Sequence, residues 1–268
     1  MTHTLVIAEL GSCHDGSLEK MKRLILAAKE CGADVAKGQY WSSADRLADR
    51  RKVPDSYREI YRRYQMPRDW LAYLAGYCES VGIEWMVTTY LPEDVATVAP
   101  FVKRFKVSSF EAGDDAFLSA YAPFDKPVMV SCGMRSGDEV WRLSDTCWSL
   151  FRDVTLLHCV SSYPAPSSEM GLSVLRRGLD DRMFDGLSDH SRQIDMGALA
   201  VAAGAEIIET HLRLDDTDPA NPDYAVAFSS AEFAEYVRLI RRAEVIMGSG
   251  EKKLQECERA MSAYRVMT

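Results

Sequence analysis

Two lysines of this 268-residue chain lie inside otherwise apolar, β-branched segments. They are Lys37 and Lys106, and an ammonium group in such surroundings needs an anionic partner because its desolvation is costly. One interpretation is an internal ion pair with Glu9 or Glu111. The other is a clamp for the phosphate or carboxylate of a ligand. Such a clamp would also use hydroxyl donors, namely Ser109, Ser131 and Ser188.

A second group of residues, His190 and His211 with Glu9, has the chemistry of a metal site. Two imidazoles with water and a nearby carboxylate suit a divalent ion such as Mn, Fe, Co or Zn. Thiolate ligation is not indicated, because the seven cysteines are scattered and no C-x-x-C is present. We therefore predict His190 and His211 as the ligands of one divalent metal.

These residues need a framework that brings them together, and the alternation of two sequence patterns predicts one. Eight short apolar runs are predicted as strands: Leu5–Leu10, Val35–Tyr40, Glu84–Tyr90, Phe105–Ser109, Pro127–Cys132, Val154–Val160, Phe184–Asp189 and Glu206–Leu212. Runs with helical periodicity lie between and after them: Leu18–Cys31, Trp70–Ser80, Glu93–Pro100, Ala116–Tyr121, Gly137–Leu150, Met170–Leu179, Asp195–Gly204 and Ala231–Met247. The pattern predicts a single-domain (β/α)8 TIM barrel over residues 1–268, with an inserted loop at residues 41–69. An open doubly wound sheet alternates similarly, but the eightfold count and the absence of G-x-G-x-x-G after the first strand favour the barrel.

The carboxyl ends of the predicted strands all carry polar or ionisable groups. A barrel keeps its active site at that end, whereas a wall made only for packing would have Val, Ile and Leu there. We therefore expect one polar site formed by these strand ends. The groups placed there include Glu9, Lys37, Gln39, Thr88, Thr89, Lys106, Ser109, Glu111, Ser131, Ser161, Tyr163, Ser188, Asp189, His190, Glu209 and His211.

Composition limits the class of protein further. The net charge of −8 disfavours nucleic acid or an anionic membrane as a partner. The odd, scattered cysteines are typical of reduced thiols, and the N-terminus has no basic lead-in to an apolar run. No apolar run approaches the roughly 20 residues of a membrane-spanning helix. We therefore expect a cytoplasmic enzyme-sized domain.

Several segments resemble the sialic acid synthase family. They are Ile7–Gly16, Ala36–Gln39, Phe105–Glu111, Pro127–Gly133, Leu157–Pro164, Gly186–His190 and Ile208–His211, in order and with nearly uninterrupted spacing. The resemblance implies the same (β/α)8 barrel. It also implies the family's reaction, in which phosphoenolpyruvate condenses with an open-chain 2-acetamido sugar to give a 2-keto-3-deoxy sugar acid and phosphate.

Carried over residue by residue, the resemblance implies three overlapping groups of site residues. Phosphoenolpyruvate would bind to Lys37, Thr89, Lys106, Ser109, Ser131, Ser161 and Ser188. The sugar would face Gln39, Glu111, Tyr163, Asp189 and Asp223. The catalytic set would be Glu9, Lys37, Lys106, Glu111, His190 and His211. The two histidines would hold the metal, Mn or Mg, and Glu9 would order its water.

The chain departs from the family mainly on the sugar side. Cys13 stands where the family usually has Asn, Thr210 where it has Lys, and Gly171 where it has Asn. The segment Asn221–Tyr224 replaces Gly-Pro-Asp-His. We therefore expect the phosphoenolpyruvate half of the reaction to be kept, with an acceptor other than N-acetylmannosamine. We expect the barrel without the family's usual C-terminal antifreeze-like domain, as a homodimer.

Two other functions are compatible with the same residues. The chain could be a metal-dependent barrel aldolase, isomerase or hydrolase that uses the histidines without phosphoenolpyruvate. It could also be a non-catalytic subunit of a larger synthase. Phosphate release by the isolated protein, dependent on both phosphoenolpyruvate and an aldose, separates the three.

Overall fold

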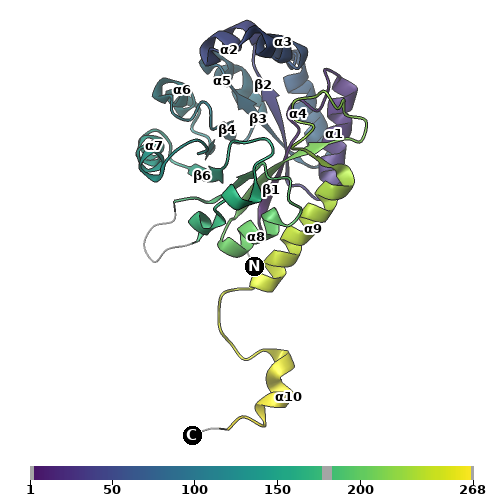
Figure 1. The fold of residues 1–268 in the computed structure, drawn as a ribbon, viewed down its shortest axis with the longest axis vertical. Helices are drawn as coiled ribbons and strands as arrows, with labels where there is room; N and C mark the ends of the chain where they lie inside the picture. The colour runs from purple at the N-terminus through teal and green to yellow at the C-terminus, as the bar shows by residue number, and fades with distance from the viewer. Residues whose placement is uncertain (1–2, 177–182, 267–268) are drawn as a thin grey trace.

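The computed structural model describes residues 3–176 and 183–266, and its centre is a closed barrel of eight parallel strands (Figure 1). Each strand pairs with the next, and β8 pairs back onto β1. The strands are β1 (Leu5–Glu9), β2 (Val35–Tyr40), β3 (Glu84–Thr89), β4 (Phe105–Val107), β5 (Val128–Ser131), β6 (Val154–Cys159), β7 (Gly186–Asp189) and β8 (Ile207–Arg213). The predicted barrel is confirmed, and every strand lies within two residues of its expected bounds.

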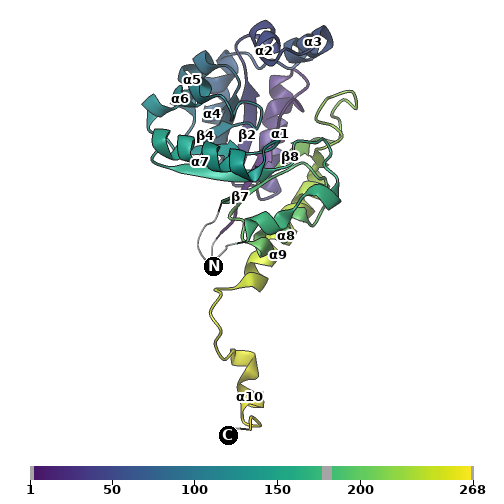
Figure 2. The same ribbon diagram turned by 60° about the vertical axis from the view of Figure 1, so that its left-hand side comes forward.

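Helices cover the outside of the barrel. They are α1 (Leu18–Glu30), α4 (Asp69–Val81), α5 (Pro92–Val98), α6 (Asp115–Ser119), α7 (Gly137–Leu150), α8 (Met196–Ala203) and α9 (Ser230–Met247). In α1, the Ser17 side chain accepts a hydrogen bond from the Lys20 amide at the start of the helix. Leu24 and Ile25 of the same helix are fully buried against the barrel. Helices α8 and α9 pack side by side, as Figure 2 shows.

The segment inserted after β2, expected as a loop, is largely helical. It forms α2 (Ala44–Arg51) and α3 (Asp55–Arg63), which pack against each other. Lys52 ends α2 in the left-handed region, with φ 52°, and so turns the chain toward α3. We call residues 44–63 the α2–α3 hairpin. It lies at the top of the molecule in both views, away from the C-terminal segment (Figures 1 and 2).

Other local predictions differ from the structure. The expected helix Met170–Leu179 is replaced by the short turns η3 (Ser167–Glu169) and η4 (Leu172–Leu175), separated by Gly171 in a left-handed conformation. Residues 177–179 of that prediction lie outside the described residues. Short turns η1 (Ala99–Phe101) and η2 (Ala122–Phe124) follow α5 and α6, and β9 (Phe228–Ser229) pairs with the end of β8. Strand β9 was not predicted, because two residues are too few to show a period.

The inside of the barrel is layered, and this layering positions the site. A buried apolar cluster lies inside the barrel, before the polar residues on each strand. It is formed by Ile7, Val35, Met86 and Met129. Side chains alternate along a strand, so the next inward positions lie two residues further on. These positions hold Glu9, Lys37, Thr88 and Ser131. The change from apolar to polar side chains therefore occurs within one two-residue step on each of these four strands.

Beyond α9 the chain leads away from the barrel through η5 (Glu256–Glu258) and α10 (Arg259–Ser262) (Figures 1 and 2). Within the described parts of the chain, no helix is both long and apolar enough to cross a membrane.

Candidate active site

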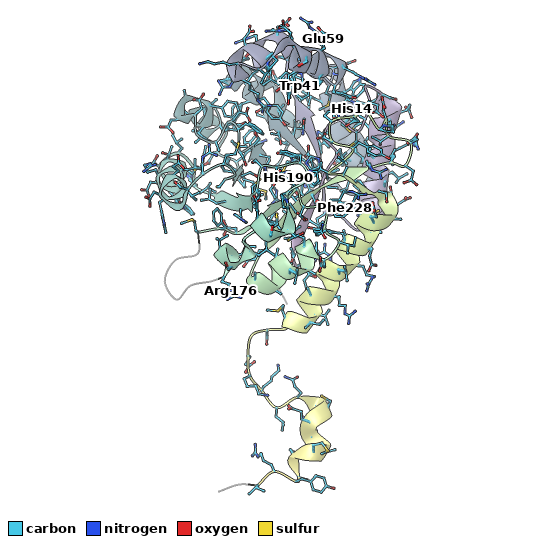
Figure 3. All side chains as sticks on the ribbon, viewed as in Figure 1. His14, Trp41, Glu59, Arg176, His190 and Phe228 are labelled. Carbon is cyan, nitrogen blue, oxygen red and sulfur yellow. The ribbon has the colours of Figure 1, made fainter. Side chains whose placement is uncertain are left out.

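A polar cavity of about 160 Å³ lies at the carboxyl ends of the strands. We call it the inner cavity. Every barrel strand, or the loop that follows it, contributes to its lining, and His190 lies near the middle of the barrel in Figure 3. The lining includes Glu9, Lys37, Gln39, Thr88, Lys106, Ser109, Ser131, Cys159, Tyr163, Ser188, His190, Glu209, His211 and Asp223. Most of the predicted site residues are therefore brought together.

Glu209 lies between the two buried lysines of this cavity. Its Oε2 is 3.5 Å from Lys37 Nζ, and its Oε1 is 3.4 Å from Lys106 Nζ. The same Oε1 accepts a hydrogen bond of 3.0 Å from the Ser188 hydroxyl. One carboxylate thus balances parts of two ammonium charges while a hydroxyl fixes its orientation.

Each lysine has further partners of its own. Lys37 forms an ion pair with Glu9 and donates a 2.9 Å hydrogen bond to Thr88 Oγ1. Lys106 donates a 2.7 Å hydrogen bond to Ser131 Oγ. The internal ion pair considered from the sequence is therefore present for Glu9, and it does not exclude an anion clamp, because the same ammonium groups line the cavity.

Burial and charge act in opposite directions on these groups. Burial would lower the pKa of Lys37, but the carboxylates of Glu209 and Glu9 outweigh it and raise that pKa. For Lys106 burial is the larger effect and the pKa is lowered. Burial would raise the pKa of Glu209, yet the two lysines hold it well below its usual range. Glu209 is therefore ionised at neutral pH.

His190 and His211 face each other across the cavity, with ring centroids 5.4 Å apart. His190 Nδ1 is 3.2 Å from the Val160 carbonyl, a contact in which the ring donates, so Nε2 has its lone pair in the neutral imidazole. Burial would lower the pKa of His190, but its contact with Cys159 outweighs burial and raises that pKa. His211 Nδ1 is buried, has no hydrogen-bond partner among the residues that the structure describes, and is 3.8 Å from Asp223 Oδ1. Burial lowers the pKa of His211, which favours the neutral imidazole.

These two rings fit the expected metal. Each can present a nitrogen lone pair, and a neutral imidazole beside a carboxylate is a common metal environment. Among residues 3–176 and 183–266, no three His, Cys, Asp or Glu side chains form a metal-binding group by themselves. A metal held by the two histidines would therefore complete its coordination with water or substrate oxygens.

Asp223 reaches this cavity from the loop after β8, where a close approach to the first βα loop holds it. Its Oδ2 accepts hydrogen bonds from the Ser12 amide at 2.7 Å and the Ser12 hydroxyl at 2.6 Å. A Cβ on Gly11 would lie only 2.3 Å from Asp223 Oδ2, so a side chain at this position would displace the carboxylate. The Gly11-Ser12 pair therefore fixes where Asp223 lies.

A second cavity, of about 920 Å³, adjoins the first and is called the outer cavity here. The two share lining residues Gln39, Arg51, Phe110, Tyr163 and Asp223. Glu111 lines the outer cavity and not the inner one. Its Oε1 accepts hydrogen bonds from Arg51 Nη2 at 2.7 Å and Nε at 3.0 Å. The ion pair of Glu111 with a buried lysine, considered from the sequence, does not form.

Three predicted site residues are placed differently by the structure. Thr89 points away from the inner cavity and its hydroxyl lies 2.7 Å from Tyr121 OH, because alternation along β3 turns Thr88 inward instead. Asp189 is fully buried on the outer side of β7, where it accepts 2.8 Å hydrogen bonds from Tyr236 OH and the Ser191 amide. Ser161 is absent from the lining of either cavity, although its Oγ is 3.7 Å from Cys159 Sγ at the rim.

Sequence reasoning assigned no role to several residues that the structure places in the site, among them Glu209 and Arg51. Glu209 had been placed at a strand end, and its spacing of two from His211 was the signal that both face inward. Arg51 comes from the inserted segment, where it was one of many basic residues and no pattern distinguished it. Its guanidinium lies 4.8 Å from the Tyr90 ring centroid and 4.9 Å from that of Phe110.

A (β/α)8 barrel with buried cations, facing imidazoles and carboxylates at its strand ends belongs to the class of barrel enzymes that act on anionic substrates. A sequence model of the NeuB family matches residues 24–252. The N,N'-diacetyllegionaminic acid synthase of Legionella pneumophila is 32% identical over 271 residues, covering 94% of this chain and 76% of that protein. The human N-acetylneuraminate-9-phosphate synthase is 32% identical over 277 residues, covering 95% of this chain and 74% of that protein.

Solved structures give the same result. The crystal structure of the N-acetylneuraminic acid synthetase from Leptospira borgpetersenii, in complex with citrate, superposes with a TM-score of 0.90 at 26% identity. The match covers 98% of this chain and 91% of that one. The chain therefore belongs to the NeuB family of phosphoenolpyruvate-utilising nonulosonic acid synthases, and the family resemblance seen in the sequence is confirmed. It is a sialic acid synthase-like transferase.

Proposed function

We propose that this protein condenses phosphoenolpyruvate with the aldehyde of an open-chain 2-acetamido sugar, in a metal-dependent reaction that gives a 2-keto-3-deoxy sugar acid and phosphate. The observation that carries the proposal is the composition of the inner cavity. Two buried ammonium groups and several hydroxyls share it with two facing imidazoles. One part suits a small polyanion, and the other suits the oxygen of an aldehyde.

The donor half of the site uses the lysines and serines. Lys37 and Lys106 neutralise the carboxylate and phosphate of phosphoenolpyruvate, and both lie at most 3% exposed at the bottom of the cavity. Hydroxyls that reach the same space orient the bound anion, namely Ser109, Ser131 and Ser188. The ammonium groups then stabilise the negative charge of the departing phosphate.

The acceptor half places the aldehyde near His190 and His211. C3 of phosphoenolpyruvate forms a bond to the aldehyde carbon, whose oxygen takes a proton and becomes a hydroxyl. Water adds at C2 and gives up a proton to Glu9, and the tetrahedral C2 then expels phosphate and becomes the keto carbon. Mn or Mg held by the two histidines would polarise the aldehyde oxygen as a Lewis acid. Gln39, Glu111, Tyr163 and Asp223 face the remainder of the sugar.

The test is phosphate release by the purified protein with phosphoenolpyruvate, Mn and a series of 2-acetamido aldoses, with product mass as the second readout. We expect Lys106→Met to lower kcat/KM by about a hundredfold or more, since it removes a cation that stabilises the departing charge. Lys103→Met is the matched control, because Lys103 is exposed three residues earlier. The proposal fails if no aldose supports phosphate release and titration calorimetry detects no binding of phosphoenolpyruvate with Mn.

A further inference from the structure

The apolar face of α3 is turned toward the outer cavity. Tyr57, Ile60, Tyr61 and Tyr64 follow the i, i+3, i+4, i+7 spacing of one helix face, and all four line that cavity. Tyr64 is buried in a cluster with Trp41, and Ile60 and Tyr61 pack partly against that cluster, whereas Tyr57 is 50% exposed. An amphipathic helix ordinarily buries its apolar face in a core, so the exposure of Tyr57 on this face needs a reason.

The polar face of α3 is fully used by ion pairs on the outside of the hairpin. Arg58 pairs with Asp49 at 2.6 Å, and Arg62 pairs with Glu59 at 2.5 Å and Asp45 at 2.6 Å. In Figure 3, Glu59 lies at the outer edge of the molecule, and Trp41 lies further in. The helix therefore cannot rotate its aromatic face outward without losing these contacts.

The charges of the outer cavity are mutually paired. Its two cations are Arg50, 2.7 Å from Asp114, and Arg51, 2.7 Å from Glu111. A further lining carboxylate is Asp223. No lining cation is therefore left over for a ligand anion, and a phosphate entering here would meet an excess of negative charge.

Two cavities share lining residues with the inner cavity: one of about 560 Å³ shares Ser109 and Phe110, and the outer cavity shares five residues and is the larger of the two. The inner cavity measures about 160 Å³, well below the roughly 300–1,000 Å³ of pockets that bury drug-sized ligands. The aldehyde is placed near His190 and His211, and the Tyr163 ring lies 4.4 Å from the His190 ring and 6.3 Å from the His211 ring. The far end of the acceptor therefore leads past the shared wall at Gln39 and Tyr163 into the outer cavity. The outer cavity, about 920 Å³, exceeds what the rest of a hexose needs.

We infer that the outer cavity binds an apolar acyl substituent at the far end of the acceptor sugar, and that it disfavours a phosphorylated acceptor. The inference rests on the proposed function for its reaction but concerns residues outside the inner cavity. Aromatic side chains of α3 and Trp41 supply the contact surface, and the paired arginines supply hydrogen-bond donors without a free positive charge. The α2–α3 hairpin is then the acceptor-specificity element of this chain.

The experiment compares one 2-acetamido aldose that supports phosphate release with its butanoyl derivatives at C4 and C6 and with its C6 phosphate. We expect at least one butanoyl derivative to have kcat/KM about tenfold above the parent, and the phosphate derivative to lie below it. Tyr57→Ala, at a residue 50% exposed, should remove most of this preference. The KM for phosphoenolpyruvate, which is placed in the inner cavity, should stay unchanged. Arg62→Ala, on the polar face, should leave the preference intact.

Equal kcat/KM for parent and butanoyl derivatives would overturn the inference while leaving the proposed function standing. A preference for the phosphate derivative, or an equal effect of Tyr57→Ala on all acceptors, would do the same. If no aldose supports phosphate release, titration calorimetry with the butanoyl derivatives alone decides the matter. Binding that Tyr57→Ala weakens and Arg62→Ala does not supports the outer cavity as a site, and absence of binding refutes it.

Discussion

The substitution Glu209→Gln tests whether the Glu209 carboxylate balances the charges of Lys37 and Lys106 when no ligand is bound. It also tests whether a bound anion can take over that role. Glu209 is 4% exposed, and its two oxygens lie 3.5 and 3.4 Å from the ammonium groups of Lys37 and Lys106. At an effective dielectric constant of about 20, each pair attracts by about 5 kcal/mol before desolvation. Removal of one partner of a buried pair typically costs about 3–5 kcal/mol. We expect the free energy of unfolding to fall by that amount in the absence of ligand.

Phosphoenolpyruvate should affect the variant more than the wild type. The amide keeps the shape of the carboxylate but no longer repels the negative charges of the ligand. If the affinity for phosphoenolpyruvate rises about tenfold, saturating ligand adds about 1.4 kcal/mol more to the variant than to the wild type. Urea unfolding without and with phosphoenolpyruvate measures both effects.

The matched control is Glu84→Gln, whose carboxylate pairs with Arg104 at 2.7 Å near the surface. It should lose at most about 1 kcal/mol and show no extra stabilisation by phosphoenolpyruvate. The reasoning is refuted if Glu209→Gln unfolds at the wild-type urea concentration, or if phosphoenolpyruvate stabilises it less than the wild type.

Two further predictions concern the barrel itself. Gly186→Ala should lower the free energy of unfolding by about 3 kcal/mol or more, because its Cβ would lie 2.2 Å from the Ile207 carbonyl oxygen. Gly76→Ala is the control, because nothing that its new Cβ could meet lies within 4 Å, and it should raise the free energy of unfolding by at most about 1 kcal/mol. Equal urea midpoints for Gly186→Ala and Gly76→Ala would contradict the prediction. Burial lowers the pKa of His14 from 6.5 to about 4, so the neutral form stabilises the fold above pH 6.5, and about 3 kcal/mol is lost as the pH falls from 6.5 to 4. His14→Gln should flatten that part of a urea-unfolding pH profile, and an unchanged slope would refute it.

The strand positions were predictable because short apolar runs alternate with longer segments of helical periodicity, and this alternation is typical of a (β/α)8 barrel. Each strand is buried on both faces, so apolar runs mark its place and turn residues mark its ends. The direction of an individual side chain is set by register, which a run of similar residues does not reveal. Thr88 and Thr89 illustrate this, since both are hydroxyl residues at one strand end and only Thr88 faces the cavity. Residues that pair across neighbouring parallel strands face the same side, and Thr88 pairs with Lys106. The strand register, together with alternation along each strand, would therefore have predicted that Thr88 faces the cavity.

The outer cavity was not predictable in the same way. It is formed by loops and by the α2–α3 hairpin, whose arrangement depends on tertiary ion pairs. Arg51 shows the difficulty, because its role depends on a 2.7 Å contact with Glu111, sixty residues away. Local sequence predicts that a helix forms, but it does not predict which distant residues the helix contacts.

Two of the positions at which the sequence departs from the family pattern lie close together in space. Cys13, where the family usually has Asn, is fully buried in the apolar core. Asn221, where it has Gly, donates hydrogen bonds to the Ser12 carbonyl at 2.8 Å and to Asp15 Oδ1 at 2.7 Å, on either side of Cys13. Its Oδ1 also accepts from the Asp223 amide at 2.9 Å. The Asn221 amide thus joins the first and last βα loops and helps to hold Asp223 beside His211.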